Sequence, residues 1–225
     1  MTRLCLFLCI TLVIMGNTCA PFAVVSTCTQ AGQATLTFDD GITNSTSRIL
    51  DVLNSFNVKA TFFLIGETLT SKTFPVLKRA YDSGHTIGNH TWSHRSLPKL
   101  NTLDLKNEIL TTQNGFLPLS QTPIKKYIRP PYGAINYTSY KLLTAEGFTV
   151  VLWNIDLKDW MGHRSRDQLW ASFQRQLVMT TPLKDSLIIL LHSKEKTADI
   201  LPDLIFTLRA NDYQIVSLEK CLSPT

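Results

Sequence analysis

The chain has 225 residues, which is enough for one α/β domain with a substantial core. Hydrophobic residues make up 44% of the sequence and charged residues 17%, an ordinary globular composition that argues against a disordered chain. The formal net charge is +5, yet the sequence has no stripe of Lys and Arg interleaved with aromatic residues, so we expect no nucleic-acid partner.

The first 20 residues differ from the remainder of the chain. Arg3 is their sole charge, and an apolar run from Leu4 to Met15 is followed by small residues. This pattern is typical of a signal peptide. The run is shorter than the about 20 apolar residues that cross a bilayer, so we expect no stable membrane span, with an uncleaved anchor as the alternative. We therefore expect residues 1–20 to be removed, residues 21–225 to form the domain, and the protein to be secreted, extracellular or in the cell wall.

Cysteine usage fits a secreted protein. Three of the five cysteines lie in the first 20 residues, which leaves Cys28 and Cys221 in the expected mature chain. Two thiols near opposite ends of such a chain indicate one disulfide, and two free thiols are the alternative. The bridge would close a loop of 193 residues (221 − 28) and tie the two ends of the fold together.

Short β-rich runs alternate with segments of helical period along the rest of the chain. In chain order the expected elements are strand 34–38, helix 45–56, strand 60–65, helix 69–81, strand 85–88, helix 101–116, strand 127–128, helix 137–146, strand 148–153, helix 166–178, strand 187–191, helix 198–210 and strand 213–216. This alternation, without a hairpin signal or a break in composition, predicts a parallel sheet in one α/β domain. Six to eight such units favour a barrel, in which chemistry lies on the loops after the carboxyl ends of the strands.

The first polar motif follows strand 34–38. It reads Thr-Phe-Asp-Asp-Gly, and Gly41 permits a sharp turn there. Neighbouring side chains on a strand point to opposite sides, but the strand end relaxes this rule, so Asp39 and Asp40 can reach one pocket and take different parts. One carboxylate would bind a metal and the other would act as a base. A solvated turn is the alternative, because turns use these residues routinely.

Two histidines follow the third expected strand. His90 and His94 are four residues apart, which on a helical turn places both rings on one side, close enough to bind one ion. With Asp40 as the third ligand they form the two-histidine, one-carboxylate set of several hydrolytic zinc sites. For the two histidines taken alone, a surface or core pair is the alternative.

Three further polar motifs come after expected strands. Arg129 opens the rigid turn Arg-Pro-Pro-Tyr-Gly, in which its guanidinium can pin a carboxylate. The segment Asp156–Trp160 supplies carboxylates that can orient a His or Arg, and an aromatic face for a sugar ring. His192 ends an apolar strand where one role is vacant, that of an acid that protonates a leaving group. The alternatives are a Pro-rich turn, an acidic loop and a satisfied core histidine.

These five ordered motifs, together with the surroundings Lys59–Phe63 and Gly84–His90, resemble those of a known family. Over about residues 28–221 the chain resembles the polysaccharide deacetylases of carbohydrate esterase family 4, and most closely the fungal chitin deacetylases. The resemblance implies a distorted (β/α) barrel and removal of acetyl groups from N-acetylglucosamine units of chitin or chitooligosaccharides. It also implies a divalent cation, usually Zn²⁺ and with Co²⁺ as another candidate, whose ligands would be Asp40, His90 and His94.

The resemblance assigns catalytic roles to five residues. Asp39 looks like the general base, and Arg129 looks like its tether. The backbone N–H of Tyr132 is expected to donate to the oxyanion of the reacting acetyl group. His192 looks like the general acid, with Asp159 as the residue that orients it.

The resemblance also concerns the substrate pocket. Trp160 and Leu190 are expected to line the space for the acetyl group, next to Tyr132. One departure is Ile42, which stands where a Pro commonly follows the Asp-Asp-Gly of the family. This change affects the turn and removes no functional group.

Other functions share the same residues. A peptidoglycan N-acetylglucosamine deacetylase and an acetylxylan esterase would use the same apparatus, and loop shape would distinguish them. A carbohydrate-binding protein without activity is a more distant alternative, because it would usually lack a base or an acid, and Asp39 and His192 are both present. We expect a polysaccharide or oligosaccharide substrate and a monomeric protein.

Overall fold

The computed structural model of the protein describes residues 23–224, and a sheet of eight strands forms its centre. The segment expected to be a signal peptide lies outside the described residues. The sheet has the order β5-β4-β3-β2-β1-β7-β6, with β8 also paired to β1, and all of these pairs are parallel. The strands are β1 (Gln33–Asp39), β2 (Thr61–Leu64), β3 (Thr86–Asn89), β4 (Tyr127–Ile128), β5 (Thr149–Val150), β6 (Ile155–Asp156), β7 (Leu187–His192) and β8 (Gln214–Ile215).

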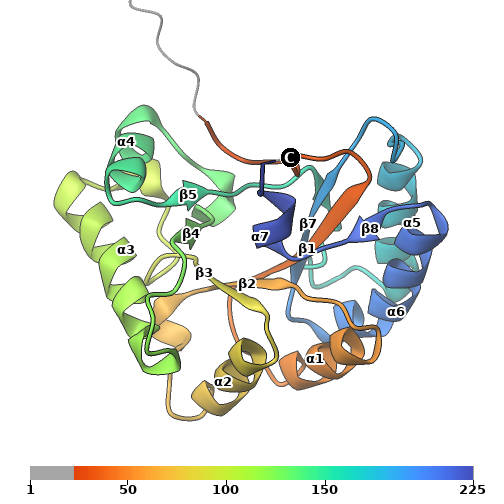
Figure 1. Ribbon diagram of the computed structural model, residues 1–225. Helices are drawn as coiled ribbons and strands as arrows, with labels where there is room; N and C mark the ends of the chain where they lie inside the picture. Colours follow the sequence, from red (N-terminus) through yellow and green to blue (C-terminus); the bar gives the residue numbers. More distant parts are fainter. Residues whose placement is uncertain (1–22, 225) are drawn as a thin grey trace, which may run out of the picture.

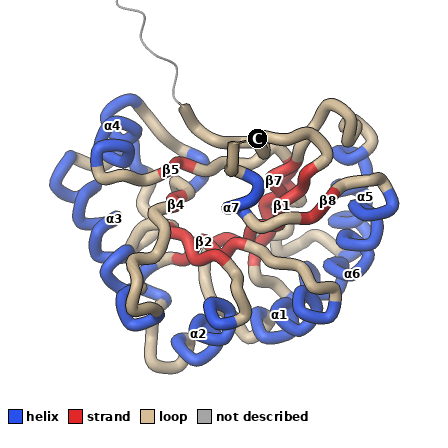
Figure 2. Tube along the Cα trace, viewed as in Figure 1, coloured by secondary structure: helices blue, strands red, loops and turns tan. Residues whose placement is uncertain are grey.

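Helices surround the outer side of this sheet (Figures 1 and 2). The α-helices are α1 (Thr46–Ser55), α2 (Phe74–Asp82), α3 (Thr102–Gly115), α4 (Tyr137–Ala145), α5 (Arg166–Leu177), α6 (Glu195–Ala210) and α7 (Leu218–Cys221). Four short 3-10 helices are η1 (Gly66–Thr68), η2 (Leu97–Lys99), η3 (Leu117–Leu119) and η4 (Pro131–Gly133). The curled parallel sheet with helices outside confirms the expected single-domain, distorted (β/α) barrel. Among the described residues, no helix is long and apolar enough to cross a membrane.

Side chains on alternate positions of each strand face opposite sides of the sheet. On β1, Phe38 belongs to the outer core that the helices cover, while Thr37 and Asp39 occupy the alternate positions. Strand β7 pairs with β1 in register, so that Leu190 lies beside Thr37 and His192 lies beside Asp39. Two neighbouring strands therefore carry polar side chains to the inner side of the barrel at their carboxyl ends.

The barrel is not closed by a continuous ladder. Strands β5 and β6 are the two ends of the strand order, and residues 151–154 pass from one to the other. The N–H of Val151 donates to β4 (2.8 Å) and the N–H of Asn154 donates to β7 (3.1 Å). The strand expected over 148–153 is thus wrong in extent, and β6 was not expected at all. Because this segment crosses between sheet edges, its hydrophobic run does not reveal where pairing stops.

Helix α2 also differs from the sequence expectation. A helix was expected over 69–81, but α2 begins at Phe74. Pro75 has no N–H and is accepted only in the first turn of a helix, so it fixes the start close to its own position. The Thr73 hydroxyl accepts a hydrogen bond from the N–H of Thr70 (2.9 Å), which stabilises the preceding loop. Helix α6 begins three residues earlier than expected, at Glu195, whose charge suits the positive end of a helix.

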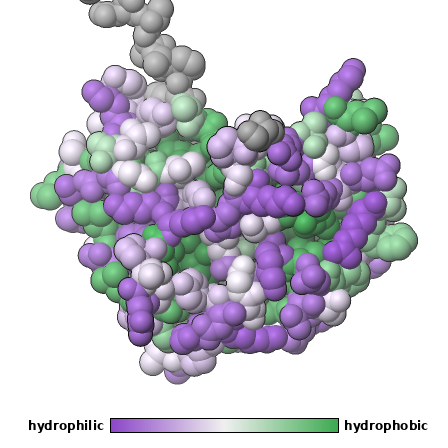
Figure 3. All heavy atoms as spheres, in the orientation of Figure 1, coloured by the Kyte–Doolittle hydropathy of each residue, from purple (hydrophilic) through white to green (hydrophobic). Residues whose placement is uncertain are grey.

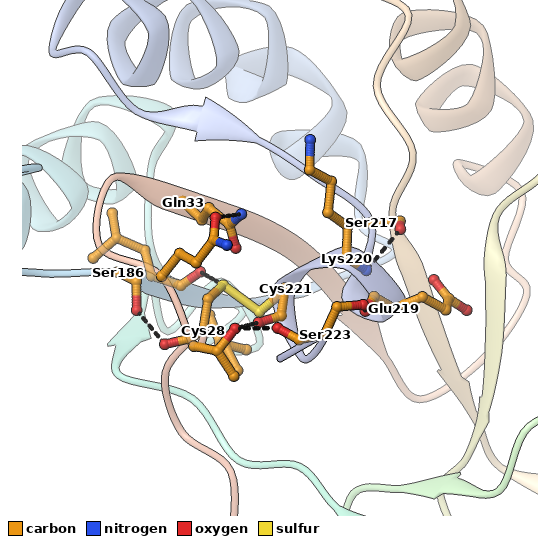
Figure 4. Close-up of a disulfide and its surroundings, with 12 residues drawn as sticks. Cys28, Gln33, Ser186, Ser217, Glu219, Lys220, Cys221 and Ser223 are labelled. Carbon is orange, nitrogen blue, oxygen red and sulfur yellow. Dashed lines mark hydrogen bonds between the residues drawn. A yellow bond between two sulfur atoms is a disulfide. The ribbon is translucent and has the colours of Figure 1, made fainter. Parts of the chain in front are cut away.

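The amino ends of the strands are closed by α7 and a disulfide. Cys28 and Cys221 are bonded as expected, with their Cα atoms 4.6 Å apart (Figure 4). Helix α7 lies over the middle of the curled sheet, and its Leu218 packs into an inner cluster with Phe63 and Ile188 (Figure 1). In the same orientation, hydrophilic side chains cover most of the surface and hydrophobic ones show mainly between them (Figure 3). The opposite end of the barrel, where the strands finish, is left for the site.

Candidate active site

A cleft of about 390 Å³ lies at the carboxyl ends of the strands. Asp39 is the last residue of β1 and His192 the last of β7, while His90 directly follows β3. The cleft is lined by Asp39, Asp40, His90, His94, Tyr132, Trp153, Asp156, Trp160, Leu190 and His192. Residues that the sequence analysis drew from distant motifs therefore meet at one place.

Three of these residues form a candidate metal site. The ligand atoms of Asp40, His90 and His94 all lie within 4.8 Å of one another. Asp40 Oδ1 is 3.8 Å from the Nε2 atoms of both histidines, too far for a hydrogen bond. Ligands around a tetrahedral zinc ion lie roughly 3.3 Å apart, so this separation is close to that of a shared cation. Two imidazoles and one carboxylate also match the ligand types that zinc prefers.

The protonation of His90 suits a metal ligand. Its Nδ1 is 2.7 Å from the carbonyl oxygen of Arg129, which only accepts, so Nδ1 carries the proton and Nε2 is left with a lone pair. Burial and the charge of His94 lower the pKa of His90 to about 3, which keeps the ring neutral. The types of the three ligands, the distances between their atoms and the tautomer of His90 therefore all fit a divalent cation.

The loop that carries the two histidines is not helical, contrary to the expectation from their spacing. Thr91 and His94 both have positive φ, at 67° and 58°, in the left-handed region that non-glycine residues rarely adopt. Local side chains stabilise this path: Asn89 Oδ1 accepts from the N–H of Thr91 (2.9 Å), and the Thr91 hydroxyl accepts from the N–H of His94 (3.1 Å). These acceptors replace the bonds of a helical turn, and the ring centroids still lie 4.9 Å apart.

Glu108 of α3 holds the middle of the same loop. Its carboxylate accepts hydrogen bonds from the N–H groups of Trp92 (2.9 Å) and Ser93 (2.8 Å), and from the Ser93 hydroxyl. Glu108 is 6% exposed, which is unusual for an acidic residue. Glu108 was not among the predicted site residues, because it lies inside a helix and not after a strand. Its position in the sequence could have indicated its burial, because Glu108 shares a helix face with Leu105 and Thr112, which are buried.

The candidate base is Asp39, which is 4% exposed and held by Arg129. Nη1 of Arg129 donates to Asp39 Oδ1 and to the Thr37 hydroxyl, both at 2.7 Å. Burial raises the pKa of Asp39, and the charges of Arg129 and His192 oppose that rise. The second oxygen of Asp39 lies 3.8 Å from Nε2 of His90, on the side of the candidate metal site.

Arg129 itself is fully buried, and all three nitrogens of its guanidinium donate hydrogen bonds. Its Nε donates to the carbonyl of Val151 (3.2 Å) and its Nη2 to the carbonyl of Leu152 (2.9 Å). These carbonyls belong to the segment that passes between the two edges of the sheet. The guanidinium also lies over the ring of Phe63, at 4.4 Å from its centroid. Arg129 thus binds the candidate base and closes the barrel with the same side chain.

The candidate acid is His192, which Asp159 orients. Nδ1 of His192 lies 2.7 Å from Asp159 Oδ1, and Asp159 Oδ2 accepts from the His192 N–H (2.7 Å) and the Thr197 hydroxyl (2.6 Å). The carboxylate only accepts, so Nε2 is the ring atom left for the cleft. Burial lowers the pKa of His192, but the hydrogen bond and charge of Asp159 outweigh it, so the pKa lies above its usual value. Thr197 was missed because it lies in α6, far from any strand end.

Aromatic and apolar side chains form the walls of the cleft. Tyr132 is 71% exposed and Trp160 52% exposed, whereas Leu190 is 4% exposed. The Tyr132 backbone has φ 62°, and its ring meets the ring of His94 edge-on with centroids 4.7 Å apart. Trp153 is a further lining residue that the sequence analysis placed in a strand. Gly133 lies so close to it that a Cβ would stand 3.1 Å from the Trp153 ring.

Left-handed backbone conformations concentrate around this cleft. Of the seven non-glycine residues with positive φ in the described chain, five lie in its loops: Asp40, Thr91, His94, Tyr132 and Lys158. Such conformations are uncommon and cluster at sites where function constrains the backbone. The structure places every residue predicted to act in catalysis, substrate binding or metal binding in or directly behind the cleft, and the chemical roles assigned to them stay predictions.

Comparison with known proteins places this chain in a family. The family model of polysaccharide deacetylases matches residues 26–151. The chain belongs to the polysaccharide deacetylase family, carbohydrate esterase family 4. Among polysaccharide deacetylases, the peptidoglycan-N-acetylglucosamine deacetylase of Bacillus cereus is 43% identical over 138 residues, which is 58% of this chain and 47% of that protein. This chain therefore spans less than half the length of that relative.

Two solved polysaccharide deacetylase structures are similar over nearly the whole chain. A peptidoglycan N-acetylglucosamine deacetylase has a TM-score of 0.81 and 34% identity, covering 91% of this chain and 94% of that chain. The chitin deacetylase of the fungal pathogen Colletotrichum lindemuthianum has a TM-score of 0.82 and 26% identity, covering 89% of this chain and 92% of that chain. The family-level resemblance is confirmed, whereas the special likeness to fungal chitin deacetylases is not: the Bacillus cereus peptidoglycan deacetylase is 43% identical over 138 residues, and the chitin deacetylase of Pestalotiopsis sp is 36% identical over 140 residues.

Proposed function

We propose that the cleft hydrolyses the acetamido group of N-acetylglucosamine units in a polysaccharide. The observation that carries the proposal is the pair of groups next to the Asp40–His90–His94 set. A buried carboxylate, Asp39, and an imidazole, His192, both line the cleft without belonging to that set. A base and an acid on either side of a cation are what amide hydrolysis requires.

We place peptidoglycan first among the substrates and chitin second, which reverses the order expected from the motifs. The Bacillus cereus relative, at 43% identity over 138 residues, is named for peptidoglycan, and the chitin deacetylase of Pestalotiopsis sp is 36% identical over 140 residues. Both structures superpose equally well on the chain, so the fold supports either polymer. An acetylxylan ester is the third candidate because the same groups would cleave it.

A divalent cation held by Asp40, His90 and His94, with Zn²⁺ first and Co²⁺ second, would polarise the acetyl carbonyl and acidify a water molecule. The protein's own groups do the remaining work. Asp39, ionised and tethered by Arg129, accepts the proton of the attacking water. The Tyr132 N–H donates to the oxyanion that develops on the carbonyl oxygen.

The departing nitrogen must be protonated, because an amide anion is a very poor leaving group. His192, whose pKa is raised by the hydrogen bond and charge of Asp159, delivers a proton from Nε2 to that nitrogen as the C–N bond breaks. Water and the amide are thereby converted to acetate and a free amine. Trp160 and Leu190 would hold the acetyl methyl group in the apolar part of the cleft.

Secretion belongs to the same proposal. It is supported by the leader-like pattern of residues 1–20 and by the Cys28–Cys221 disulfide, which is typical of oxidising compartments. An enzyme outside the cell or in the wall would meet the polymers proposed here.

The test is acetate release from peptidoglycan glycan strands, chitooligosaccharides and acetylxylan, each with and without a chelator. We expect release from the first to be fastest and the chelator to abolish it. Asp39→Asn keeps an oxygen acceptor for Arg129 and leaves the candidate ligands intact, so we expect bound metal with turnover lowered about 10²- to 10⁴-fold. A folded, metal-loaded protein that binds glycans and releases no acetate would support the silent binding protein instead.

A further inference from the structure

A second hollow, of about 700 Å³, adjoins the cleft. Its lining residues are His94, Arg95, Ser96, Lys99, Leu100 and Tyr132, and we call it the basic hollow. His94 and Tyr132 line both the cleft and the basic hollow. A polymer whose acetamido group occupies the cleft would therefore pass its neighbouring sugar over the basic hollow.

The basic hollow carries positive charge that the protein leaves largely available. Its six lining residues include Arg95 and Lys99 and no Asp or Glu. The Arg95 side chain is 53% exposed, and its Nη2 forms a long ion pair with Asp104 Oδ2 at 3.7 Å, beyond a good hydrogen bond. Lys99 is exposed, and within residues 23–224 its ammonium makes no ion pair or hydrogen bond with the protein.

An ordered turn presents these two cations. Residues Leu97–Lys99 form η2, in which the N–H of Lys99 donates to the carbonyl of Ser96 and that of Leu100 to the carbonyl of Leu97, both at 3.1 Å. Leu97 is 1% exposed and packs in the core cluster beneath α3 and α4. The backbone of the turn is therefore fixed before a ligand arrives, which lowers the entropy cost of binding.

We propose that Arg95 and Lys99 bind a carboxylate on the sugar next to the one that is deacetylated. This inference rests on the proposed function and assigns its specificity. The matching substrate is a glycan in which N-acetylglucosamine alternates with an acidic amino sugar, because a neutral polymer such as chitin offers these cations no partner. Arg and Lys bind carboxylates through charge-assisted hydrogen bonds, the stronger class of such bonds. The exposed Tyr132 ring between the two spaces offers a flat face for the sugar chain.

The test compares the acidic and neutral substrates within each variant. We would measure kcat/KM for Arg95→Gln, Lys99→Gln and the double variant on a peptide-free glycan strand, the same strand with its peptide stems, and a chitooligosaccharide of equal length. We expect the ratio of acidic to neutral kcat/KM to fall about tenfold in each single variant and further in the double one. The matched control is Lys125→Gln, an exposed lysine that precedes β4 at the opposite end of the strands, which should leave the ratio unchanged.

The substrates also identify the source of the carboxylate. A fall on the peptide-free strand assigns the carboxylate to the sugar, as proposed, whereas a fall only on the strand with stems assigns it to the peptide and overturns that assignment. An unchanged ratio in the double variant overturns the role of both cations. If wild-type protein releases no acetate from any substrate, the proposed function fails, and calorimetric binding of the same glycans still tests the hollow. Equal affinity of wild type and double variant for the peptide-free strand then refutes it.

Discussion

Replacing Glu108 tests whether the histidine loop is held in place by a buried carboxylate. Glu108→Ala removes the acceptor for the N–H groups of Trp92 and Ser93 and for the Ser93 hydroxyl. Leaving buried or half-buried donors without partners costs about 1–3 kcal/mol each, so we expect the free energy of unfolding to fall by about 3 kcal/mol. Glu108→Gln keeps one oxygen for the N–H groups but loses the charge and replaces the oxygen that accepts from the Ser93 hydroxyl by an NH2 group, and we expect a loss of about 1 kcal/mol.

The same change should weaken metal binding. Residues behind the ligands typically contribute 10- to 100-fold to metal affinity, so we expect a loss in that range for Glu108→Ala and a smaller one for Glu108→Gln. Urea unfolding without metal measures the stability, and calorimetric titration with Zn²⁺ measures the affinity. Glu146→Ala, which removes a surface pair with Lys106, is the control and should change neither by much. Wild-type zinc affinity in the folded Ala variant would refute the reasoning that Glu108 positions the ligands.

Three further predictions concern the bridge and the titrating groups. Replacing Cys28 and Cys221 by Ala should lower the free energy of unfolding by about 5 kcal/mol in the chain-entropy model, and unchanged urea midpoints would contradict this. Burial and nearby cations lower the pKa of His85 from 6.5 to about 4, so the unfolded chain binds a proton first as pH falls and stability drops by about 3 kcal/mol from pH 6.5 to pH 4. His85→Gln should remove that pH dependence in denaturation curves. Turnover should rise as Asp39 ionises above its usual 3.8 and fall as His192 deprotonates above 6.5, and His192→Gln should lose the alkaline limb of the rate profile.

The parts of the site that follow strand ends could be predicted from the sequence. Asp39 and His192 each close an apolar run, and parallel strands bring their carboxyl ends to one edge. The register of β1 and β7 then places these two residues side by side. The hydrophobic pattern of each strand and the position of the polar residue at its end are enough for this inference, because both can be read within one short segment of the sequence.

The residues behind the site could not be predicted in the same way. Glu108 and Thr197 lie within helices, and their partners are 15 or more residues away in sequence, so only the folded chain shows which polar groups meet. The loop from His90 to His94 was expected to be a helical turn from the four-residue spacing of the two histidines. That spacing does not show which side-chain acceptors compete for the N–H groups of the loop. The segment 151–154 looked like more strand because burial alone does not distinguish a paired run from one that crosses between two edges.

The double use of Arg129 has a consequence for how this chain can change over generations. A lineage that replaced Asp39 by an apolar residue would leave a guanidinium buried beside no counter-charge, and replacing Arg129 as well would strip the carbonyls of Val151 and Leu152 of their donors. Loss of the base is therefore coupled to loss of the barrel's closure. Evolution toward an inactive protein with this fold should therefore replace Asp39 by a neutral hydrogen-bond acceptor such as Asn, or should substitute residues other than Asp39 and Arg129.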